Sequence, residues 1–290
     1  YKSPFALPPP SMRKHAEKAQ IEMSQGSESD QVTIYNAMIK HDQIRKKSGE
    51  GAWKDFCRRN FLSPATMQMI SELRTNIKRE LQSLNFPDPM QLGSFHNRNQ
   101  NKEAIWQAAL AAGLYPNVCT RRRGEVNFST MTNRKCKIHI SSVNAVKGQP
   151  LNNKCQIPLG EVEFVCFGEM VKGAHMFTIS QTTHIASPLP LLLLCGTALT
   201  VQPDPRNDKL AILGLDDWIV FKGPSDVVAM LVILRKRLDR AFLRTLAQPA
   251  FSGEQTLENE DRAAIDVLGT VLQSAVKSSN VRWNMEKGVY

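Results

Sequence analysis

Basic side chains are the residues of this sequence whose type and spacing indicate chemistry, and they gather between residues 114 and 154. Glu125 is the single acid of that stretch, which also holds Arg121, Arg122, Arg123, Arg134, Lys135, Lys137, Lys147 and Lys154. Lysine and arginine bind nucleic acids by neutralising phosphates and releasing condensed counterions. The cluster therefore indicates a surface that follows a phosphate backbone. A solvated basic face is the alternative that the residues leave open.

Motifs of common catalytic sites are absent from the sequence. It contains no GxxxxGK[ST] phosphate loop, no GxGxxG, no HExxH and no GxSxG. Asp216 and Asp217 are adjacent, so on a strand they would point to opposite faces, and we interpret them as a turn feature. His139 and His184 lie in strand-like segments, where a lone histidine is usually structural. We predict no catalytic residue and no cofactor in this chain.

The cysteines show no metal-binding spacing. They form no CxxC pair and no zinc-ligand set with histidine, and they stand at Cys57, Cys119, Cys136, Cys155, Cys166 and Cys195. We predict no metal site and interpret these residues as buried or free thiols of a reducing compartment.

The overall composition favours a polyanionic partner. Among 290 residues, 37 Lys and Arg stand against 27 Asp and Glu, a formal net charge of +10. No leader peptide follows Tyr1, and the apolar run 188–201 is shorter than the roughly 20 residues that span a bilayer. We expect an intracellular fragment of a longer protein, in the nucleus or cytoplasm, without membrane contact.

The first third of the chain is predicted to be helical after an irregular beginning. Four prolines within residues 1–26 exclude a regular helix there, so residues 1–28 are interpreted as a linker. Ser29 or Asp30 caps the next helix, which a polar break at residues 46–51 ends. Three further helices follow: a short one that starts with Trp53, one capped by Ser63, and an Ala-rich one over residues 101–112. Their predicted buried residues are Val32, Tyr35 and Ile39, then Trp53, Phe56 and Cys57, then Met67, Ile70, Leu73, Ile77, Leu81 and Leu84.

Short strands follow the helices. Segments rich in β-branched and aromatic residues lie at 114–120, 125–131, 135–140, 164–171, 176–185, 189–195 and 209–221. Five or more short strands in this space predict a small barrel. A last helix opens at Ser225 and is predicted to bury Val227, Leu231, Leu234, Leu238 and Phe242. Residues 250–290 are predicted to be a polar, loosely attached tail.

Several strings together resemble one protein family. "FCRRNFLSPATMQMISELR" at residues 56–74, "AAGLYPNV" at 111–118, "CKIHISSVN" at 136–144 and "LDDWIVF" at 215–221 are similar to the region that follows the motor in DEAH-box RNA helicases. "FGEMVKG" at residues 167–173 and the His-x-Ser-Ser-Val-Asn pattern resemble the RNA helicase A-like group. The resemblance implies an α+β protein, with a helical ratchet-type bundle (29–112) followed by an OB-fold barrel (113–249) that carries a flanking helix.

The resemblance also implies an RNA-binding role. In that family OB-fold loops contact the RNA backbone, which points here to His139, Ile140, Ser141, Ser142 and Lys172, beside the basic residues Arg121, Arg122, Arg123 and Lys137. His139 could donate to a phosphate, stack on a base or serve in packing. ATP and Mg would belong to RecA-like motor domains that this chain lacks, so we predict an accessory region that binds single-stranded RNA for an ATP-dependent helicase. A platform that recruits a regulatory protein cofactor is the alternative, and DNA in place of RNA remains open.

Overall fold

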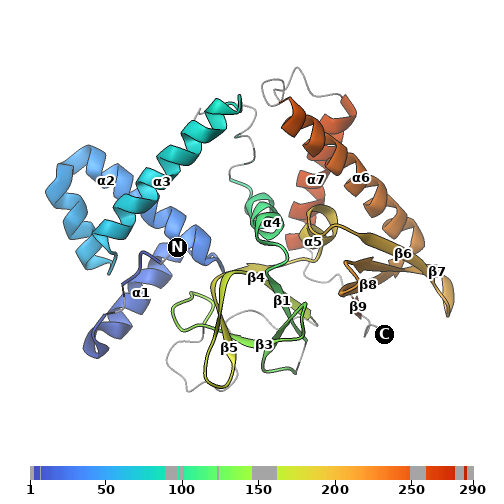
Figure 1. Ribbon diagram of the computed structural model, residues 1–290, viewed down its shortest axis with the longest axis horizontal. Helices are drawn as coiled ribbons and strands as arrows, with labels where there is room; N and C mark the ends of the chain where they lie inside the picture. The colour runs from blue at the N-terminus through green and yellow to red at the C-terminus, as the bar shows by residue number, and fades with distance from the viewer. Residues whose placement is uncertain are drawn as a thin grey trace. The chain divides into compact units, whose positions relative to one another are not determined.

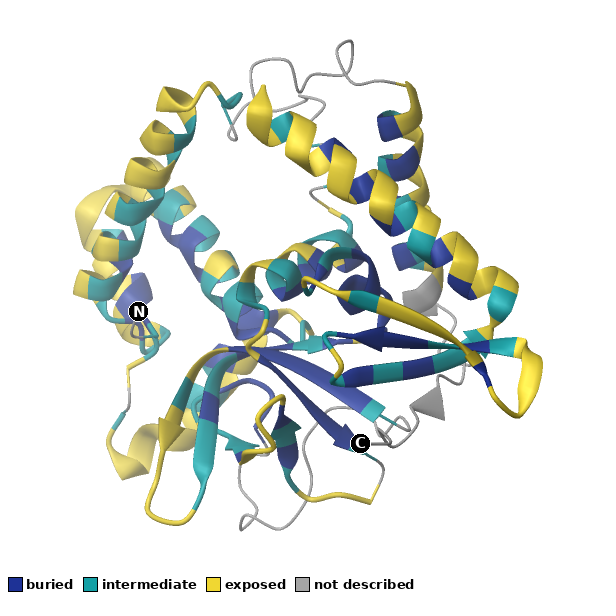
Figure 2. Cartoon of the chain, turned by 45° about the vertical axis from the view of Figure 1, so that its right-hand side comes forward, coloured by how far each residue is buried: buried dark blue, intermediate teal, exposed yellow. Residues whose placement is uncertain are grey.

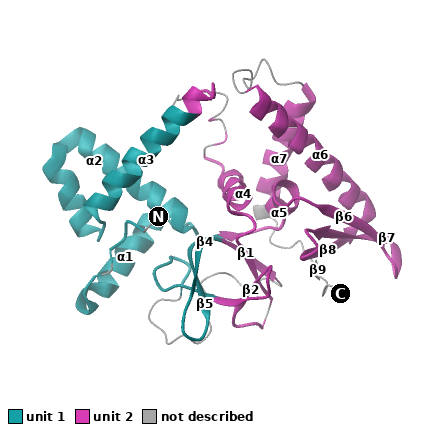
Figure 3. Ribbon diagram, in the orientation of Figure 1, with its two compact units in different colours: residues 1–80, 137–158, 167–183 teal, residues 81–136, 159–166, 184–290 magenta. Residues whose placement is uncertain are grey.

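The computed structural model describes residues 3–6, 8–88, 97, 99, 101–122, 124–145, 162–248, 259–277 and 284–285. The chain divides into two compact units (Figure 3). Unit 1 comprises Tyr1–Glu80, Lys137–Pro158 and Phe167–Thr183, and unit 2 comprises Leu81–Cys136, Leu159–Cys166 and His184–Tyr290.

Unit 1 begins with helices where the sequence predicted an irregular linker. A 3-10 turn over Pro10–Met12 leads into helix α1, Arg13–Ser24 (Figure 1). The linker prediction is wrong for these residues because the prolines end at Pro10, which stands at the start of the turn, where a missing N–H removes no helical hydrogen bond.

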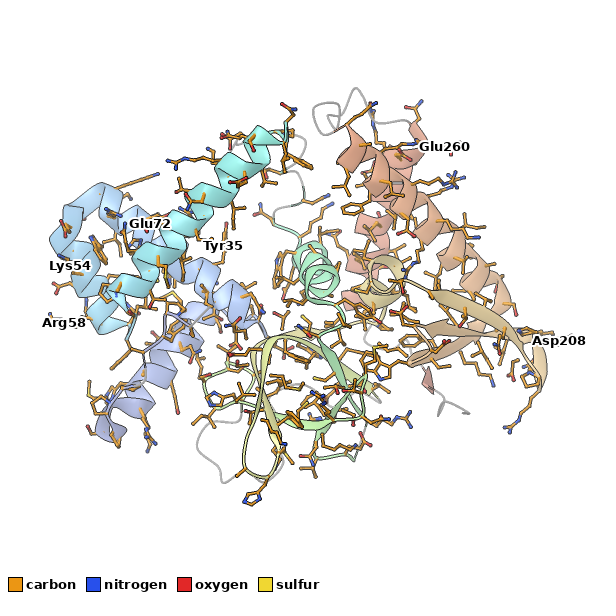
Figure 4. The ribbon with its side chains drawn as sticks, in the orientation of Figure 1. Tyr35, Lys54, Arg58, Glu72, Asp208 and Glu260 are labelled. Carbon is orange, nitrogen blue, oxygen red and sulfur yellow. The ribbon has the colours of Figure 1, made fainter. Side chains whose placement is uncertain are left out.

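Helix α2, Asp30–Arg59, contains the break that the sequence predicted. Gly49 has φ 77° and ψ −170°, which interrupts the helix in its second half. Ser29 is the N-cap and its hydroxyl accepts from the backbone N–H of Val32. The buried face differs from the prediction, since Thr33, Ala37, Met38 and His41 are buried, whereas Tyr35, marked in Figure 4, is 61% exposed.

Helix α3, Pro64–Ser83, contributes its first two turns to the core of unit 1. Met67 is buried in a core with Met38, Trp53, Phe56 and Cys57, and the ring of His41 meets the Trp53 ring edge-on at 5.0 Å. Ile77 and Leu84, predicted to be buried, are exposed. The colouring by burial in Figure 2 shows most of α3 as intermediate or exposed.

Five strands close the predicted barrel, in the order β1-β2-β3-β5-β4. Their bounds are Val118–Arg122 (β1), Phe128–Thr130 (β2), Lys135–Ile138 (β3), Val162–Lys172 (β4) and Phe177–Ile185 (β5). All five correspond to predicted strand segments, so the α+β class with a helical bundle followed by a small barrel is confirmed.

Unit 2 adds a second sheet and helices around it. Helix α4, Glu103–Leu114, precedes β1, and a four-stranded sheet has the order β6-β7-β8-β9. The strand bounds are Leu199–Asp204 (β6), Asn207–Leu215 (β7), Ile219–Pro224 (β8) and Asn284–Met285 (β9). Asp216 and Asp217 form the turn between β7 and β8 with positive φ angles, as predicted.

Three predictions for unit 2 need correction. Residues 189–195 are not a strand but mostly helix α5, Leu189–Leu194, which is buried throughout most of its length. Helix α6, Ser225–Ala247, buries Val228, Leu231, Leu238 and Ala241, while Val227 and Phe242 are exposed. The predicted tail contains helix α7, Asn259–Lys277, whose Ala264 and Leu272 join the unit 2 core because one face of this helix is apolar.

Candidate nucleic-acid interface

The loop after β3 is held rigidly by its own polar side chains. The backbone N–H of Ser142 donates to the carbonyl of His139 at 3.0 Å, which closes a turn. The hydroxyls of Ser142 and Thr182 lie 2.8 Å apart, and the Asn144 amide donates to the Thr182 hydroxyl at 3.0 Å and to the Glu28 carbonyl at 3.1 Å. Buried polar groups that are satisfied in this way fix a single conformation.

Helix α2 contributes a buried carboxylate to the same loop. Asp30, in the first turn of α2, accepts from the backbone N–H of Val143 and from that of Thr182, each at 2.8 Å. The preceding residue, Ser29, shares a hydrogen bond of 2.6 Å with the hydroxyl of Thr183. The two hydrogen bonds to the Asp30 carboxylate are charge-assisted, and such bonds are stronger than those between neutral groups. They join the loop and β5 to the start of α2.

The protonation pattern of His139 follows from its neighbours. The backbone N–H of Ser141 donates to Nδ1 of His139 at 3.2 Å, and the Ser141 hydroxyl lies 2.8 Å from the same nitrogen. A backbone N–H can only donate, so Nδ1 is the acceptor and the neutral ring carries its proton on Nε2. Gln20 of α1 holds the other side of the loop, because its amide donates to the Ser141 carbonyl at 2.9 Å.

The hairpin of β4 and β5 contributes further polar side chains next to this loop. Side chains two residues apart share a face of a strand, which places Glu169 with Val171 on β4 and Thr178 with Ser180 on β5. The Ser180 hydroxyl donates to Oε2 of Glu169 at 3.4 Å, across the two strands. The hairpin therefore presents one carboxylate among hydroxyl and apolar groups.

Gln181 also lines this side of the hollow, although it directly follows Ser180, because its backbone departs from regular strand geometry. It has φ 54°, an unusual value for a residue within a strand, and its side chain lies over Gly168. A Cβ atom at Gly168 would come within 2.5 Å of the Gln181 Oε1 atom. Gln31 of α2 secures the Gln181 backbone, since its amide donates to the Gln181 carbonyl at 2.6 Å.

These segments enclose a hollow of about 340 Å³ that lies entirely within unit 1. It is lined by Ser3, Phe5, Gln20, Asp30, Ile34, His139, Ser141, Glu169, Val171, Thr178, Ser180 and Gln181. Its described lining combines hydrogen-bond donors, acceptors and three apolar side chains. Such a mixture is typical of sites that bind small polar groups with an apolar face.

The structure divides the predicted loop residues by role. His139 and Ser141 line the hollow. Ile140 is 62% exposed. Ser142 is 1% exposed and bonded to Thr182, so its predicted contact with RNA is corrected to a structural role.

The predicted basic residues do not form one described group. Arg121 is 5% exposed, its guanidinium donates to Oε2 of Glu163 at 2.7 and 3.0 Å, and it lies 4.7 Å from the Phe128 ring centroid. We therefore remove Arg121 from the candidate interface, because a buried and paired cation is not available to a phosphate.

The other basic residues differ in their placement. Lys137 is half-buried and Lys172 is exposed, both within unit 1, whereas Arg122 is half-buried in unit 2. Arg123 lies outside the described residues. Lys137 and Lys172 are thus the predicted cations that share a unit with the hollow.

Several residues of the hollow were missed by reasoning from sequence. The sequence indicates only a capping role for Asp30, and Gln20 lies in the predicted linker. Glu169 stands inside the "FGEMVKG" string, so its acidic side chain within a family motif was the available signal. Gln181 carried no signal, because its role depends on a positive φ angle that side-chain type does not reveal.

The prediction for the cysteines has a structural counterpart. Cys57, Cys119, Cys136, Cys166 and Cys195 are buried thiols that take part in no disulfide, as predicted, and Cys155 lies outside the described residues. In the part of the chain that the structure describes, no helix is both long enough and apolar enough to cross a bilayer.

The barrel region of the chain matches a known protein family. Residues 106–198 match the oligonucleotide/oligosaccharide-binding (OB)-fold family. This range contains all five barrel strands together with most of α4 and α5. The predicted OB fold is confirmed.

Curated relatives extend the similarity to most of the chain. The DExH-box ATP-dependent RNA helicase DExH1 of Arabidopsis thaliana is 28% identical over 252 residues, which are 86% of this chain and 23% of that protein. The ATP-dependent DNA/RNA helicase DHX36 of Bos taurus is 25% identical over 301 residues, covering 100% of this chain and 28% of the relative. The human ATP-dependent RNA helicase DHX29 is 25% identical over 278 residues, 89% of this chain and 18% of the relative. The chain thus spans less than a third of the length of each of these relatives.

Proposed function

This chain is homologous to DExH/DEAH-box RNA helicases over most of its length, and we propose that it is the accessory region with which its parent helicase holds single-stranded RNA. In this proposal the RNA strand passes over the hollow of unit 1. The ATP and Mg that drive movement belong to RecA-like domains outside this chain. The parent acts inside the cell.

One observation carries the proposal. The loop that contains His139 and Ser141 is built into a polar hollow by contacts to three other segments, at Gln20, Asp30 and Thr182. A loop whose half-buried hydroxyl and imidazole groups line a hollow, and which is fixed by this many buried bonds, is preorganised for hydrogen bonding to a ligand. Ribose hydroxyls and base edges of single-stranded RNA are partners of that chemistry.

Lys172 and Lys137 supply the electrostatic part of the proposed binding. Lys172 directly follows Val171, which lines the hollow, and Lys137 stands two residues before His139. Because Lys172 ends β4 on the face opposite to that of Val171, we assign both lysines to phosphates beside the hollow and not within it. Phosphate contacts position the strand without reading its sequence.

The test is equilibrium binding of a fluorescein-labelled 12-nucleotide RNA at several KCl concentrations, read by anisotropy. The affinity should fall as salt rises, with a slope of about 0.7 per phosphate contact. Lys172→Ala should reduce that slope, and His139→Ala with Ser141→Ala should weaken binding at every salt concentration. Lys54→Ala removes the same charge from the exposed face of α2 and is the matched control. A salt-independent affinity, or equal effects of Lys54→Ala and Lys172→Ala, would remove the proposal.

The choice between RNA and DNA has its own experiment. Unlabelled RNA and DNA of the same sequence should compete unequally for the protein, because only RNA offers the 2′-hydroxyl. Equal competition would assign the chain to single strands of either kind. DHX36, one of the relatives, is named as a DNA/RNA helicase.

A protein-interaction platform is the second candidate, and one observation favours it. Helices α6 and α7 enclose an apolar groove of about 210 Å³, in which Met230, Ile233 and Val267 are substantially exposed. Arg237 also lines this groove, which suits an acidic cofactor. Capture of a defined acidic cofactor by the wild-type chain after RNase treatment, and its loss with Ile233→Asp, would favour this candidate.

A further inference from the structure

The hollow in unit 1 has an unusual charge for an RNA-binding surface. Its described lining includes two carboxylates, those of Asp30 and Glu169, and neither Lys nor Arg. Asp30 already accepts two backbone N–H groups, so its oxygens are committed to the fold. Glu169 is exposed, and the hydrogen bond that it accepts from the Ser180 hydroxyl is long at 3.4 Å. The hollow therefore disfavours a phosphate and leaves one carboxylate available as an acceptor for a ligand.

The size and apolar part of the hollow fit a nucleoside. A volume of about 340 Å³ lies at the lower end of the range for small-molecule sites. Phe5, Ile34 and Val171 contribute apolar surface among polar neighbours. A planar base needs that combination, because its faces are apolar and its edges carry hydrogen-bonding groups.

Two lining residues have opposite and fixed hydrogen-bonding roles. Glu169 in its ionised form only accepts. His139 offers Nε2–H as a donor, because the Ser141 backbone N–H occupies Nδ1. A base bound by both must therefore present at least one donor and one acceptor on its edge.

Guanine matches this pair better than the other bases. Its edge carries the O6 acceptor beside two adjacent donors, N1–H and N2–H, and a carboxylate can accept both donors at once. Adenine and cytosine place a ring nitrogen acceptor at that position, which would face the negative charge of Glu169. Uracil offers a single N–H. We infer that the hollow is a nucleobase pocket that selects guanine, with Glu169 as the specificity-determining residue and His139 as the donor to O6.

The structure holds Glu169 in place for this role. The Ser180 hydroxyl donates to its Oε2 atom, and the neighbouring Gly168 leaves room for the side chain of Gln181. Gln181 is itself secured by Gln31. The acceptor therefore sits on a strand pair whose local geometry is fixed by several bonds. This inference rests on the proposed RNA binding and adds a base preference to it.

The experiment compares three 12-nucleotide RNAs with the full chain. One is oligoadenylate, one carries two guanines at its centre, and one carries two inosines, which lack the N2 amine. The wild type should bind the guanine RNA about tenfold more tightly than oligoadenylate, with the inosine RNA between them. Glu169→Gln should reduce this preference to within about twofold, since a neutral amide distinguishes the edges less. Glu72→Gln, on the exposed face of α3, is the matched control and should retain the full preference.

The possible outcomes distinguish the guanine pocket from the proposed RNA binding on which it rests. Equal, salt-dependent binding of all three RNAs by the wild type would overturn the guanine pocket and leave RNA binding intact. A guanine preference that survives Glu169→Gln would overturn the role of Glu169. Failure to bind any of the RNAs at low salt would instead overturn the proposed function itself. Thermal unfolding of Glu169→Gln at the wild-type temperature confirms that the variant is folded.

Discussion

The carboxylate of Asp30 accepts a hydrogen bond of 2.8 Å from the backbone N–H of Thr182, although 152 residues separate the two in the chain. Its other oxygen accepts from Val143, so a single side chain at the start of α2 satisfies two backbone donors. This relationship places the helices of unit 1 and the loop after β3 in one assembly. The geometry of His139 and Ser141 depends on it.

Replacement of Asp30 by Ala should lower the free energy of unfolding of the chain by about 3 kcal/mol, because two buried donors lose a charged acceptor. Amide hydrogen exchange at Val143 and Thr182 should accelerate more than elsewhere in unit 1. Asp55→Ala removes a carboxylate that pairs only with exposed Arg58 and should change stability by no more than about 0.5 kcal/mol. Unchanged exchange at both amides in Asp30→Ala would contradict the role of this residue.

Arg121 should matter for stability and not for RNA binding. Arg121→Ala leaves Glu163 buried without its cation, which should cost about 3 to 5 kcal/mol in urea unfolding. The RNA affinity of the protein that remains folded should equal that of the wild type. Arg122→Ala, at the adjacent and more exposed position, is the control for stability. A fully stable Arg121→Ala variant with weakened RNA binding would restore Arg121 to the interface.

Asp216 should give unit 2 a measurable acid sensitivity. Burial raises the pKa of its carboxyl, but hydrogen bonds from the Tyr115 hydroxyl and from the backbone N–H groups of Ala198 and Thr197 outweigh it, so the pKa lies below its ordinary value. A depressed folded-state pKa contributes stability above the unfolded pKa of about 3.9, and this stability is lost as the pH falls through the folded value.

The measurement is the difference in stability between the wild type and Asp216→Asn as a function of pH. The wild type should be the more stable at pH 7, and the difference should shrink below about pH 4. If the stability difference in favour of the wild type grew as the pH fell, the depressed pKa of Asp216 would be contradicted.

Gly168→Ala should disturb the hollow, because the new Cβ atom would meet the Gln181 side chain at 2.5 Å. We expect an RNA affinity several-fold below that of the wild type, and recovery of part of it when Gln181→Ala is added, since the collision is then relieved. Gly113→Ala is the control, because nothing lies within 4 Å of its Cβ position at the end of α4. Loss of affinity in Gly168→Ala without any recovery in the double variant would contradict the packing of these two residues.

Local patterns predicted much of this fold. The caps at Ser29 and Ser63, the break near Gly49 and the five barrel strands are all set by short-range chemistry, so side-chain type was sufficient. The run 189–195 was misread because a fully buried apolar segment has no periodicity to distinguish strand from helix. Pro190 in the first turn of α5 was the overlooked signal for a helix.

The candidate site was less predictable than the fold. His139 and Ser141 were found through a family motif, whereas Asp30, Glu169 and Gln181 join them through contacts between distant segments. The buried face of α6 also differs from the predicted one, since Val228 is buried and Val227 is exposed. This helix carries apolar residues on more than one face, and its contacts in the folded protein determine which face is buried. Tertiary packing of this kind is not encoded in any short window.

Photochemical cross-linking tests the central claim most directly. A 12-nucleotide RNA that carries 4-thiouridine at successive positions would be bound to the chain at low salt, irradiated, and mapped by mass spectrometry of the cross-linked peptides. The account predicts adducts on the peptides that contain His139 to Ser141 and Glu169 to Gln181. Adducts confined to α6, α7 or the sheet of β6 to β8, with none on those two peptides, would contradict it.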